Sequence, residues 1–546
     1  MKVSPNGVEG RAVVGLSLLL FAAGCTTHQV GLSPHPVVGA PPAYSIAPQV
    51  DAVSVEMWWQ AFDDARLNAL IEASLEENLT VAQALERIDR AEFVLRRARA
   101  TPKPQVDLST RGERSYERER LKDVEEESGL DQIQSALSEL EPSLSALDST
   151  LGALRPEDDG GDLGPGSSGK TQGSSGDGRG GSDDTRRTTD SYVSQFSTGL
   201  SLSWELDFWG RLRSESKARG EELAAVVYDY ETLRLLLSSQ VADAYYQALE
   251  QRLQHDLLMQ QLESGRTILD LLELRFLQGA ASLVDVLQQR GQLADIEAEI
   301  PVVQAQLRLL ENRLDVLMGR PPDGNDLTDG PEPSLPPTST LPPLGVPVDL
   351  LQNRPDLKAL QRRVVAADYR IASAIAERFP RITLDGSMRY GETPDAATFT
   401  AAAAADLLQP LWDWGQRQAA VLEARSSLQE ALLSFSQAYL IALEEVETTL
   451  WQEFRQRELI DALARREEIL QQTVNETRVR YSLGVTDYLP VLTAVQDLQD
   501  VQRELLRQRR VQVSLRVQLY RAIGGGVAPR ANLPGIQPME TAGPAT

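Results

Sequence analysis

The stretch GPGSSGKT, residues Gly164 to Thr171, is the first feature of this sequence that could carry chemistry. It matches the Walker A pattern G-x-x-x-x-G-K-[S/T], in which backbone N–H groups and a lysine bind nucleotide phosphates between a buried strand and a helix N-terminus. The stretch follows EDDGGDL and precedes QGSSGDGRGGSDD, so neither an apolar strand nor a helix flanks it. Ten of the residues 160–182 are glycine, a composition in which the pattern arises easily by chance. A P-loop nucleotidase therefore stays an alternative that lacks its flanking elements.

The remaining residue types point away from catalysis. Only three histidines and one cysteine occur among 546 residues, so the sequence predicts no Cys/His metal site and no intrachain disulfide. The net charge of −25 argues against nucleic acid as a partner, because phosphates require Lys and Arg. No catalytic constellation is apparent. We therefore predict a protein that is not an enzyme and that needs no cofactor or metal.

The single cysteine, Cys25, has an informative position. Lys2 and Arg11 precede the apolar run AVVGLSLLLFAA, which has the layout of a secretory signal and is too short for a permanent membrane helix. The small residues before Cys25 resemble the lipobox of bacterial lipoproteins, and that resemblance implies cleavage after residue 24 and lipidation of Cys25. Thr26, rather than Asp, then favours the outer membrane. An ordinary signal peptide with an incidental cysteine is the alternative.

The chain is an internal duplication. RFLQGAASLVDVL from Arg275 and RYSLGVTDYLPVL from Arg480 are 205 residues apart, and the same offset relates DFWGR to WDWGQ. Upstream, the offset becomes 276, because Pro104 aligns with Pro380. The two offsets differ by 71 residues, so the first repeat carries an insertion at about 120–190. Residues 121–190 hold 16 acidic and 6 basic side chains, and they contain the Walker-like stretch.

These offsets divide the chain into segments. We expect a signal peptide at 1–24, a Pro-rich N-terminal segment at 25–55, a first repeat at 56–319, a Pro-rich linker at 320–349, a second repeat at 350–523 and a disordered tail at 524–546.

Each repeat contains one long helix and two shorter ones. Apolar residues recur at steps of three and four through 213–277, and the equivalent segment is 417–482. A 65-residue helix would be about 98 Å long. The flanking segments 66–100, 283–318, 351–378 and 487–523 also have helical patterns. Two shorter helices stacked end to end could therefore pair with each long helix, as in an elongated helical barrel or bundle.

Alternating segments predict four strands per chain. QFSTGLSLSWELDF places apolar residues on one face and small polar residues on the other, and RITLDGSMRY does the same, whereas QVDLSTRGE and TFTAAAAADLLQPL are weaker. A soluble sheet would also alternate, but an apolar face with aromatic ends is typical of membrane barrels. We assign the membrane-facing aromatics to Phe196, Trp204, Phe208 and Tyr390. Four strands cannot close a barrel, so membrane insertion would require oligomerisation.

The motifs SWELDFWGRLR, YYQALEQ, RFLQGAASLVDVLQ, NRPDLKALQRRVVAADYRI and RFPRITLDGS resemble the TolC-type outer-membrane factor family, in its lipoprotein branch. The resemblance spans about 56–523 apart from the insertion. It implies a homotrimer with a 12-stranded outer-membrane barrel and an α-helical periplasmic tunnel. It further implies the exit duct of a tripartite efflux system in a Gram-negative bacterium, with a periplasmic adaptor and an inner-membrane transporter of the resistance-nodulation-division type as partners.

The resemblance also assigns roles to two helical hairpin tips. Gly279 and Gly484 lie in the turns, and the tips would form the periplasmic end to which adaptor hairpins dock and which opens like an iris. Arg275 and Arg480 begin the two tip motifs. Asp285 and Asp487 are the nearest candidates for an acidic ring around the aperture, although either could instead cap its helix. A hairpin turn without a partner is the alternative for both tips.

A third possibility is a lipid-anchored periplasmic coiled-coil scaffold without channel activity. Lipid-bilayer reconstitution separates it from a channel, because a scaffold gives no conductance.

Under the duct hypothesis, the insertion would face the cell exterior as a long acidic loop. Deleting residues 121–190 is therefore expected to leave export and trimer assembly unchanged, as measured by efflux assays and native mass. Loss of the trimer on deletion would show that the loop is structural.

Overall fold

The computed structural model describes residues 28–31, 34–46, 57–120, 188–325, 334–338, 341–393 and 395–526. The chain forms two compact units, one helical and one containing the strands. The elements in chain order are η1 (Trp58–Phe62), α2 (Ala65–Glu77), α3 (Leu79–Ala100), β1 (Gln105–Arg120), β2 (Thr188–Leu206), α5 (Arg211–Leu277), α6 (Leu283–Leu317), η2 (Pro347–Asp349), α7 (Leu350–Asn353), α8 (Pro355–Ala376), β3 (Arg381–Thr393), β4 (Ala396–Leu408), α9 (Gln416–Ser482) and α10 (Leu489–Ala522).

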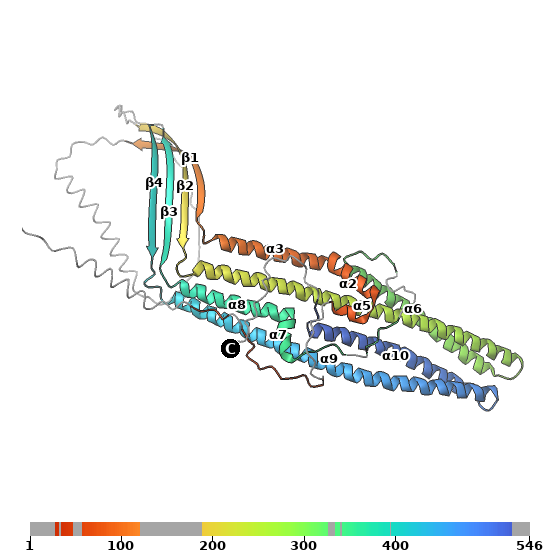
Figure 1. Ribbon diagram of the computed structural model, residues 1–546. Coiled ribbons are helices and arrows are strands. Elements are labelled where there is room, and N and C mark those ends of the chain that lie inside the picture. Colours follow the sequence, from red (N-terminus) through yellow and green to blue (C-terminus); the bar gives the residue numbers. More distant parts are fainter. Residues whose placement is uncertain are drawn as a thin grey trace, which may run out of the picture. The chain divides into compact units, whose positions relative to one another are not determined.

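Two helices of 67 residues, α5 and α9, form the frame of the helical unit. Each begins after a glycine in the left-handed region, Gly210 at φ 78° and Gly415 at φ 86°. In Figure 1, α3, α5, α8 and α9 lie side by side, and α6 and α10 run along the distal parts of α5 and α9. The expected pairing of one long helix with two shorter ones is confirmed in both repeats.

The prediction of one continuous helix is wrong for two segments, each of which forms two helices. The segment 66–100 breaks at Asn78, whose side chain caps α3 by accepting hydrogen bonds from the N–H groups of Thr80 (2.7 Å) and Val81 (3.2 Å). The segment 351–378 breaks at Arg354 because Pro355 disfavours helical geometry in the residue before it. Both breaks occur at the same position of the repeat.

These breaks form matching joints between stacked helices. The Asn78 side chain donates a hydrogen bond to the Leu317 carbonyl at the end of α6, 2.8 Å away. The Arg354 guanidinium donates to the Ala522 carbonyl at the end of α10, 3.0 Å away. Asn78 and Arg354 are 276 residues apart, and Leu317 and Ala522 are 205 apart. Each joint satisfies a terminal helix carbonyl that has no partner within its helix, so the repeat offsets hold in three dimensions.

A glycine makes each joint possible. Gly319 and Gly524 both have φ 78° and follow the ends of α6 and α10. A Cβ on Gly319 would lie 2.5 Å from the Glu77 carbonyl oxygen, and one on Gly524 would lie 2.8 Å from the Arg354 backbone nitrogen. Only glycine allows the two backbones to approach this closely.

A buried ion cluster links α9, α10 and the inter-repeat linker. Glu453 is 1% exposed and Arg516 is 5% exposed. The Glu453 carboxylate accepts hydrogen bonds from Arg457 Nη2 (2.8 Å) and Arg516 Nε (3.2 Å). Both guanidinium groups also donate to the Thr338 carbonyl of the linker, each at 3.0 Å. The cluster therefore fixes the linker on the two helices.

The N-terminal segment lies on α8 and α9. The Asp368 carboxylate contacts the His28 ring and accepts a 2.7 Å hydrogen bond from the Gly31 N–H. Further along, the Ser45 N–H donates to Glu447 Oε1 at 2.9 Å, and Tyr44 is buried. This segment is thus attached to the second repeat along both helices.

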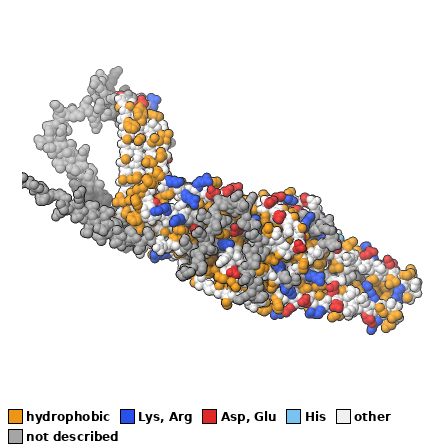
Figure 2. Space-filling model, in the orientation of Figure 1, with side chains coloured by type: hydrophobic (Ala, Val, Ile, Leu, Met, Phe, Trp, Pro, Cys, Tyr) orange, Lys and Arg blue, Asp and Glu red, His pale blue; other side chains and the backbone are white. Residues whose placement is uncertain are grey.

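The strand unit is one four-stranded sheet in the order β1-β2-β3-β4. β1 and β2 are antiparallel, with Val106 opposite Leu202 and Leu108 opposite Leu200, so these four side chains share a face. All four are 40–72% exposed. Figure 2 shows hydrophobic side chains gathered over the strands. The four predicted strands are therefore confirmed, and β1 and β4 are the edge strands of the sheet that the described residues form.

Candidate functional surfaces: hairpin tips and strand face

The first hairpin tip is a tight glycine turn between α5 and α6. Gly279 has φ 71°, its N–H donates to the Phe276 carbonyl at 2.9 Å, and the Ala280 N–H donates to the Arg275 carbonyl at 2.8 Å. This pattern is the Schellman closure of a helix C-terminus. Nothing lies within 4 Å of the position that a Cβ on Gly279 would take. Glycine is therefore favoured here by the backbone conformation of the turn and not by close approach of a neighbour.

Asp285 is part of a capping box at the start of α6. Its Oδ2 accepts a hydrogen bond from the Ser282 N–H at 2.9 Å, and its own N–H donates to Ser282 Oγ at 3.1 Å. Both groups would otherwise lack helical partners. The capping alternative for Asp285 is therefore what the geometry shows.

The second tip, between α9 and α10, repeats the turn. Gly484 has φ 71°, and the Arg480 carbonyl accepts the Val485 N–H at 2.9 Å. The Arg480 guanidinium pairs with Glu476 at 2.8 Å. Asp487 is exposed, and within the described part of the chain it makes no ion pair. Unlike Asp285, this carboxylate is free to meet another molecule.

The two tips are joined by a contact that the sequence did not predict. The Arg275 guanidinium lies over the Tyr481 ring, 4.5 Å from its centroid, and Tyr481 packs edge-on against Tyr488 at 5.6 Å. Tyr488, 2% exposed, donates its hydroxyl to Gln289 Oε1 at 2.5 Å. The Gln289 amide in turn donates to the Gly265 carbonyl at 2.9 Å. This chain of contacts, the tip contact, holds the hairpins together.

Burial raises the pKa of the Tyr488 phenol well above its usual range, and the neighbouring Tyr481 adds to this shift. The hydroxyl therefore keeps its proton and its role as donor at physiological pH. Tyr488 also belongs to a small apolar cluster that bridges the hairpins, with Leu272, Val286, Val491 and Leu492. The two tip motifs that begin at Arg275 and Arg480 indicate the hairpin tips in the sequence. They do not indicate which residues meet there, because the contacting residues lie on different hairpins.

The four predicted aromatics occupy different environments. Phe196 and Tyr390 are 46% and 39% exposed on their strands. Trp204 is half-buried, and its indole N–H donates to the Pro102 carbonyl at 3.0 Å. Phe208 is a correction: β2 ends at Leu206, so this residue lies beyond the strand, 64% exposed. The alternating pattern continued past the point where the backbone turns towards α5.

Several predicted features lie outside the described residues: Cys25, the Walker-like stretch Gly164–Thr171 and most of the acidic insertion. Within the described ranges, no group of His, Cys, Asp and Glu side chains could hold a metal ion. None of the helices that the structure describes is long and apolar enough to span a membrane.

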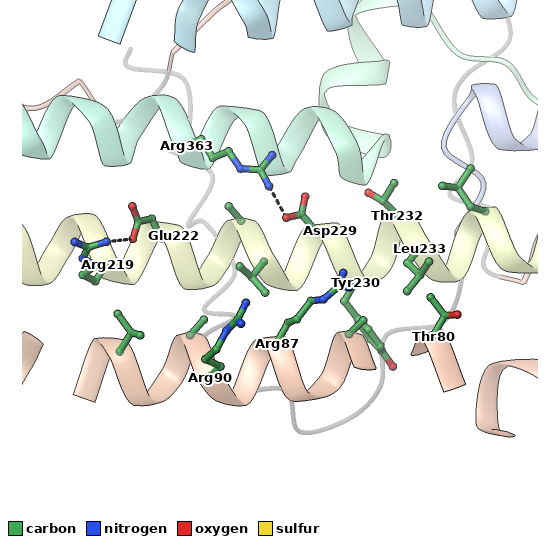
Figure 3. Close-up of a pocket in the computed structure, with 16 residues that line it drawn as sticks. Thr80, Arg87, Arg90, Arg219, Glu222, Asp229, Tyr230, Thr232, Leu233 and Arg363 are labelled. Carbon is green, nitrogen blue, oxygen red and sulfur yellow. Dashed lines mark hydrogen bonds and ion pairs between the residues drawn. The ribbon is translucent and has the colours of Figure 1, made fainter. Parts of the chain in front are cut away.

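A groove of about 630 Å³ runs between α3 and α5 (Figure 3). Arg363 pairs with Asp229, and Arg219 pairs with Glu222 at 2.9 Å. Burial raises the pKa of the Asp229 carboxyl despite the neighbouring Arg363. The lining holds no His or Cys, and its acids are neutralised by arginines. The groove therefore presents no catalytic set.

The sequence model of the family described as Outer membrane efflux protein matches residues 164–320 and 346–525. The pyoverdine export outer membrane protein OpmQ of Pseudomonas aeruginosa is 30% identical over 355 residues, which cover 63% of this chain and 73% of OpmQ. Nodulation protein T of Rhizobium leguminosarum bv. trifolii is 27% identical over 487 residues, covering 88% and 90%.

Solved structures share the fold. The Campylobacter jejuni CmeC outer membrane channel superposes with a TM-score of 0.70 at 19% identity, covering 92% of this chain and 95% of CmeC. The outer membrane protein VceC of Vibrio cholerae gives 0.66 at 23% identity, covering 86% and 98%.

Proposed function

Because this chain belongs to the outer membrane efflux protein family, we propose that it forms the outer-membrane exit duct of a tripartite efflux system. The family consists of transport channels that work in such systems, and its members act in the outer membrane of Gram-negative bacteria. The observation that carries the proposal is the match of the family model to residues 164–320, in the first repeat, and 346–525, in the second. The exported compounds would be drugs or other small solutes.

We further propose a homotrimer whose twelve strands close one barrel. Two observations support this: among the described residues no strand pairs with the outer edges of β1 and β4, and one face of the sheet is apolar and exposed. Open strand edges are not tolerated in lipid, so edges from three copies would have to pair with one another. Cys25 would carry the lipid anchor.

The hairpin tips would be the periplasmic aperture and the docking point of the adaptor, which would serve a transporter of the resistance-nodulation-division type. The proposed contact residues are Arg275, Gly279, Asp285, Arg480, Gly484 and Asp487. Gly279 and Gly484 leave open space around the turns, so a partner helix could approach the backbone there. Asp487 is the better candidate for an acidic ring, because the Asp285 carboxylate is engaged in its cap.

Reconstitution in planar lipid bilayers tests the proposed function. A duct gives discrete conductance steps, whereas a lipid-anchored scaffold gives none. Absence of conductance from protein that is trimeric by native mass would refute the channel.

Tyr488→Phe is expected to open the aperture more often. The change removes the hydroxyl that donates to Gln289 and keeps the ring, which weakens the tip contact by about 1 kcal/mol. An opening equilibrium would then shift by roughly fivefold, which single-channel recording measures. Tyr439→Phe is the matched control, because its hydroxyl donates to the Pro347 carbonyl on η2, away from both tips. Equal open fractions in the two variants would contradict a gating role for the tip contact.

A further inference from the structure

Trp209 shows how the first repeat is held against the second. Its indole stacks on the Phe379 ring, with centroids 4.9 Å apart and planes at 25°. Its indole N–H donates to the Pro380 carbonyl at 2.8 Å. This contact lies just before α5 on one side and just after α8 on the other. It therefore closes one end of the α5–α8 interface within the chain.

The repeat assigns a counterpart to each member of this contact. The offset of 205 relates Trp209 to Trp414, and the offset of 276 relates Phe379 and Pro380 to Lys103 and Pro104. The helix joints and the capping glycines Gly210 and Gly415 obey the same two offsets. The chain therefore contains a second set of residues for the same kind of contact, with Trp414 as one partner and Lys103–Pro104 as the other.

Within one chain this second contact is not made. Trp414 is 90% exposed at φ 54°, and both Lys103 and Pro104 are exposed. α3, which precedes Pro104, packs on α5, and α9, which follows Trp414, packs on α8 and α10. Figure 1 shows α3 and α9 at opposite edges of the helical layer. A second copy of the chain is needed to bring the two halves together.

Residues on the helices next to this contact are related by the same two offsets. In the chain, Lys217 of α5 lies 5.5 Å from the centroid of the Tyr369 ring of α8. The counterparts are Leu422 on α9, 53% exposed, and Phe93 on α3, 59% exposed. The Lys217–Tyr369 pair is thus replaced by two apolar side chains that are more than half exposed in the described part of the chain, where the Arg96 guanidinium lies 5.5 Å from the centroid of the Phe93 ring. Such a pair would be buried only if α9 of one copy lies against α3 of another.

Positions along the long helix agree. Ala218, Ala225 and Leu235 are 0%, 1% and 6% exposed on α5. Their counterparts on α9 are all exposed, and they are Glu423, Glu430 and Leu440. These three positions, covered on α5, are therefore uncovered on α9.

We propose that Trp414 of one copy packs on Lys103 and Pro104 of a second copy, with its indole N–H donating to the Pro104 carbonyl, and that Leu422 meets Phe93 along the same interface. The inference rests on the proposed trimer and adds the residues that join its subunits. Lys103 takes the place of Phe379, so the stacked pair becomes a cation over an indole face. The interface copies the α5–α8 contact with a second set of side chains.

Lipid is the competing occupant for Trp414, because Trp side chains are common at membrane–water boundaries. The repeat favours protein, since the counterpart indole has a protein carbonyl as its acceptor.

Thiol crosslinking of the full-length protein in native membranes tests the interface. The interface pairs are Phe93→Cys with Leu422→Cys, and Lys103→Cys with Trp414→Cys. The reference pairs, Lys217→Cys with Tyr369→Cys and Trp209→Cys with Phe379→Cys, occupy the equivalent contacts inside one chain. A flexible bis-maleimide is added, and the products are separated on a denaturing gel. Single-cysteine variants and the wild type, whose only cysteine is Cys25, are the controls.

Both interface pairs are expected to give covalent dimers and trimers, whereas the reference pairs stay at monomer mass with both thiols consumed. Interface pairs that remain monomeric on the gel, in protein whose native mass is a trimer, overturn the interface and leave the proposed duct standing. Reaction of the cysteine at 414 with a lipid-soluble maleimide in place of crosslinking identifies lipid as the occupant and overturns the proposal. A monomeric native mass overturns the trimer itself.

Discussion

Gly319→Ala is expected to lower the free energy of unfolding by about 4 kcal/mol. The new Cβ would lie 2.5 Å from the Glu77 carbonyl oxygen and 3.1 Å from its carbon. These are backbone atoms, which cannot rotate away as the end of a side chain could. The substitution also places an L-residue at φ 78°. Chemical denaturation followed by far-ultraviolet circular dichroism measures the loss.

Gly279→Ala is the matched control. Gly279 has φ 71°, so the backbone strain is nearly the same, but nothing lies within 4 Å of the added Cβ. We expect a loss of about 1 kcal/mol, the cost of the left-handed conformation alone. Both variants are compared at one protein concentration, because subunit association contributes to apparent stability. Equal losses in the two variants would mean that the joint between α6 and α2–α3 can separate freely.

The elements that were predictable from sequence are those that rest on local periodicity. Steps of three and four continue without proline through 213–277, and the structure has one helix there. The breaks at Asn78 and Arg354 were missed although Asn is a strong N-cap and Pro355 restricts the residue before it. The apolar stripe continues across both breaks, because stacked helices face the same neighbour. Periodicity therefore could not separate one helix from two.

The tip contact was not predictable for a different reason. Gln289 and Tyr488 are 199 residues apart, and their meeting depends on the register between two hairpins. No local pattern records that register. The glycines were found because a tight turn constrains its own residues, whereas Tyr481 and Tyr488 look like ordinary amphipathic positions. The prediction that Phe208 lies on a strand was wrong for the opposite reason. The local alternation of apolar and polar residues continues to Phe208, whereas the strand ends at Leu206.

Glu453→Gln is expected to lower the free energy of unfolding by about 3 kcal/mol, because it leaves two guanidinium groups beside a buried site without their counter-charge. Glu453 is 1% exposed, and its carboxylate contacts both Arg457 and Arg516. Glu458→Gln on the same helix is the control. Its ion pair with Arg455 is formed by side chains that are 53% and 62% exposed, so its loss should cost about 0.5 kcal/mol. Denaturant midpoints of the two variants give the comparison.

A double variant shows what the buried cluster does beyond pairing charges. In Glu453→Leu/Arg516→Met the buried charges are removed together, so most of the loss seen in Glu453→Gln should be recovered. Arg457 is 34% exposed and can turn its head group to water. The hydrogen bond from Arg516 to the Thr338 carbonyl should still be lost, so that this carbonyl accepts at most the hydrogen bond from Arg457. The linker should then loosen, and limited proteolysis within 334–338 should be faster than in the wild type while the helical signal is unchanged. Unchanged proteolysis would mean that packing of the linker, and not its hydrogen bonds to the two arginines, holds the repeats in register.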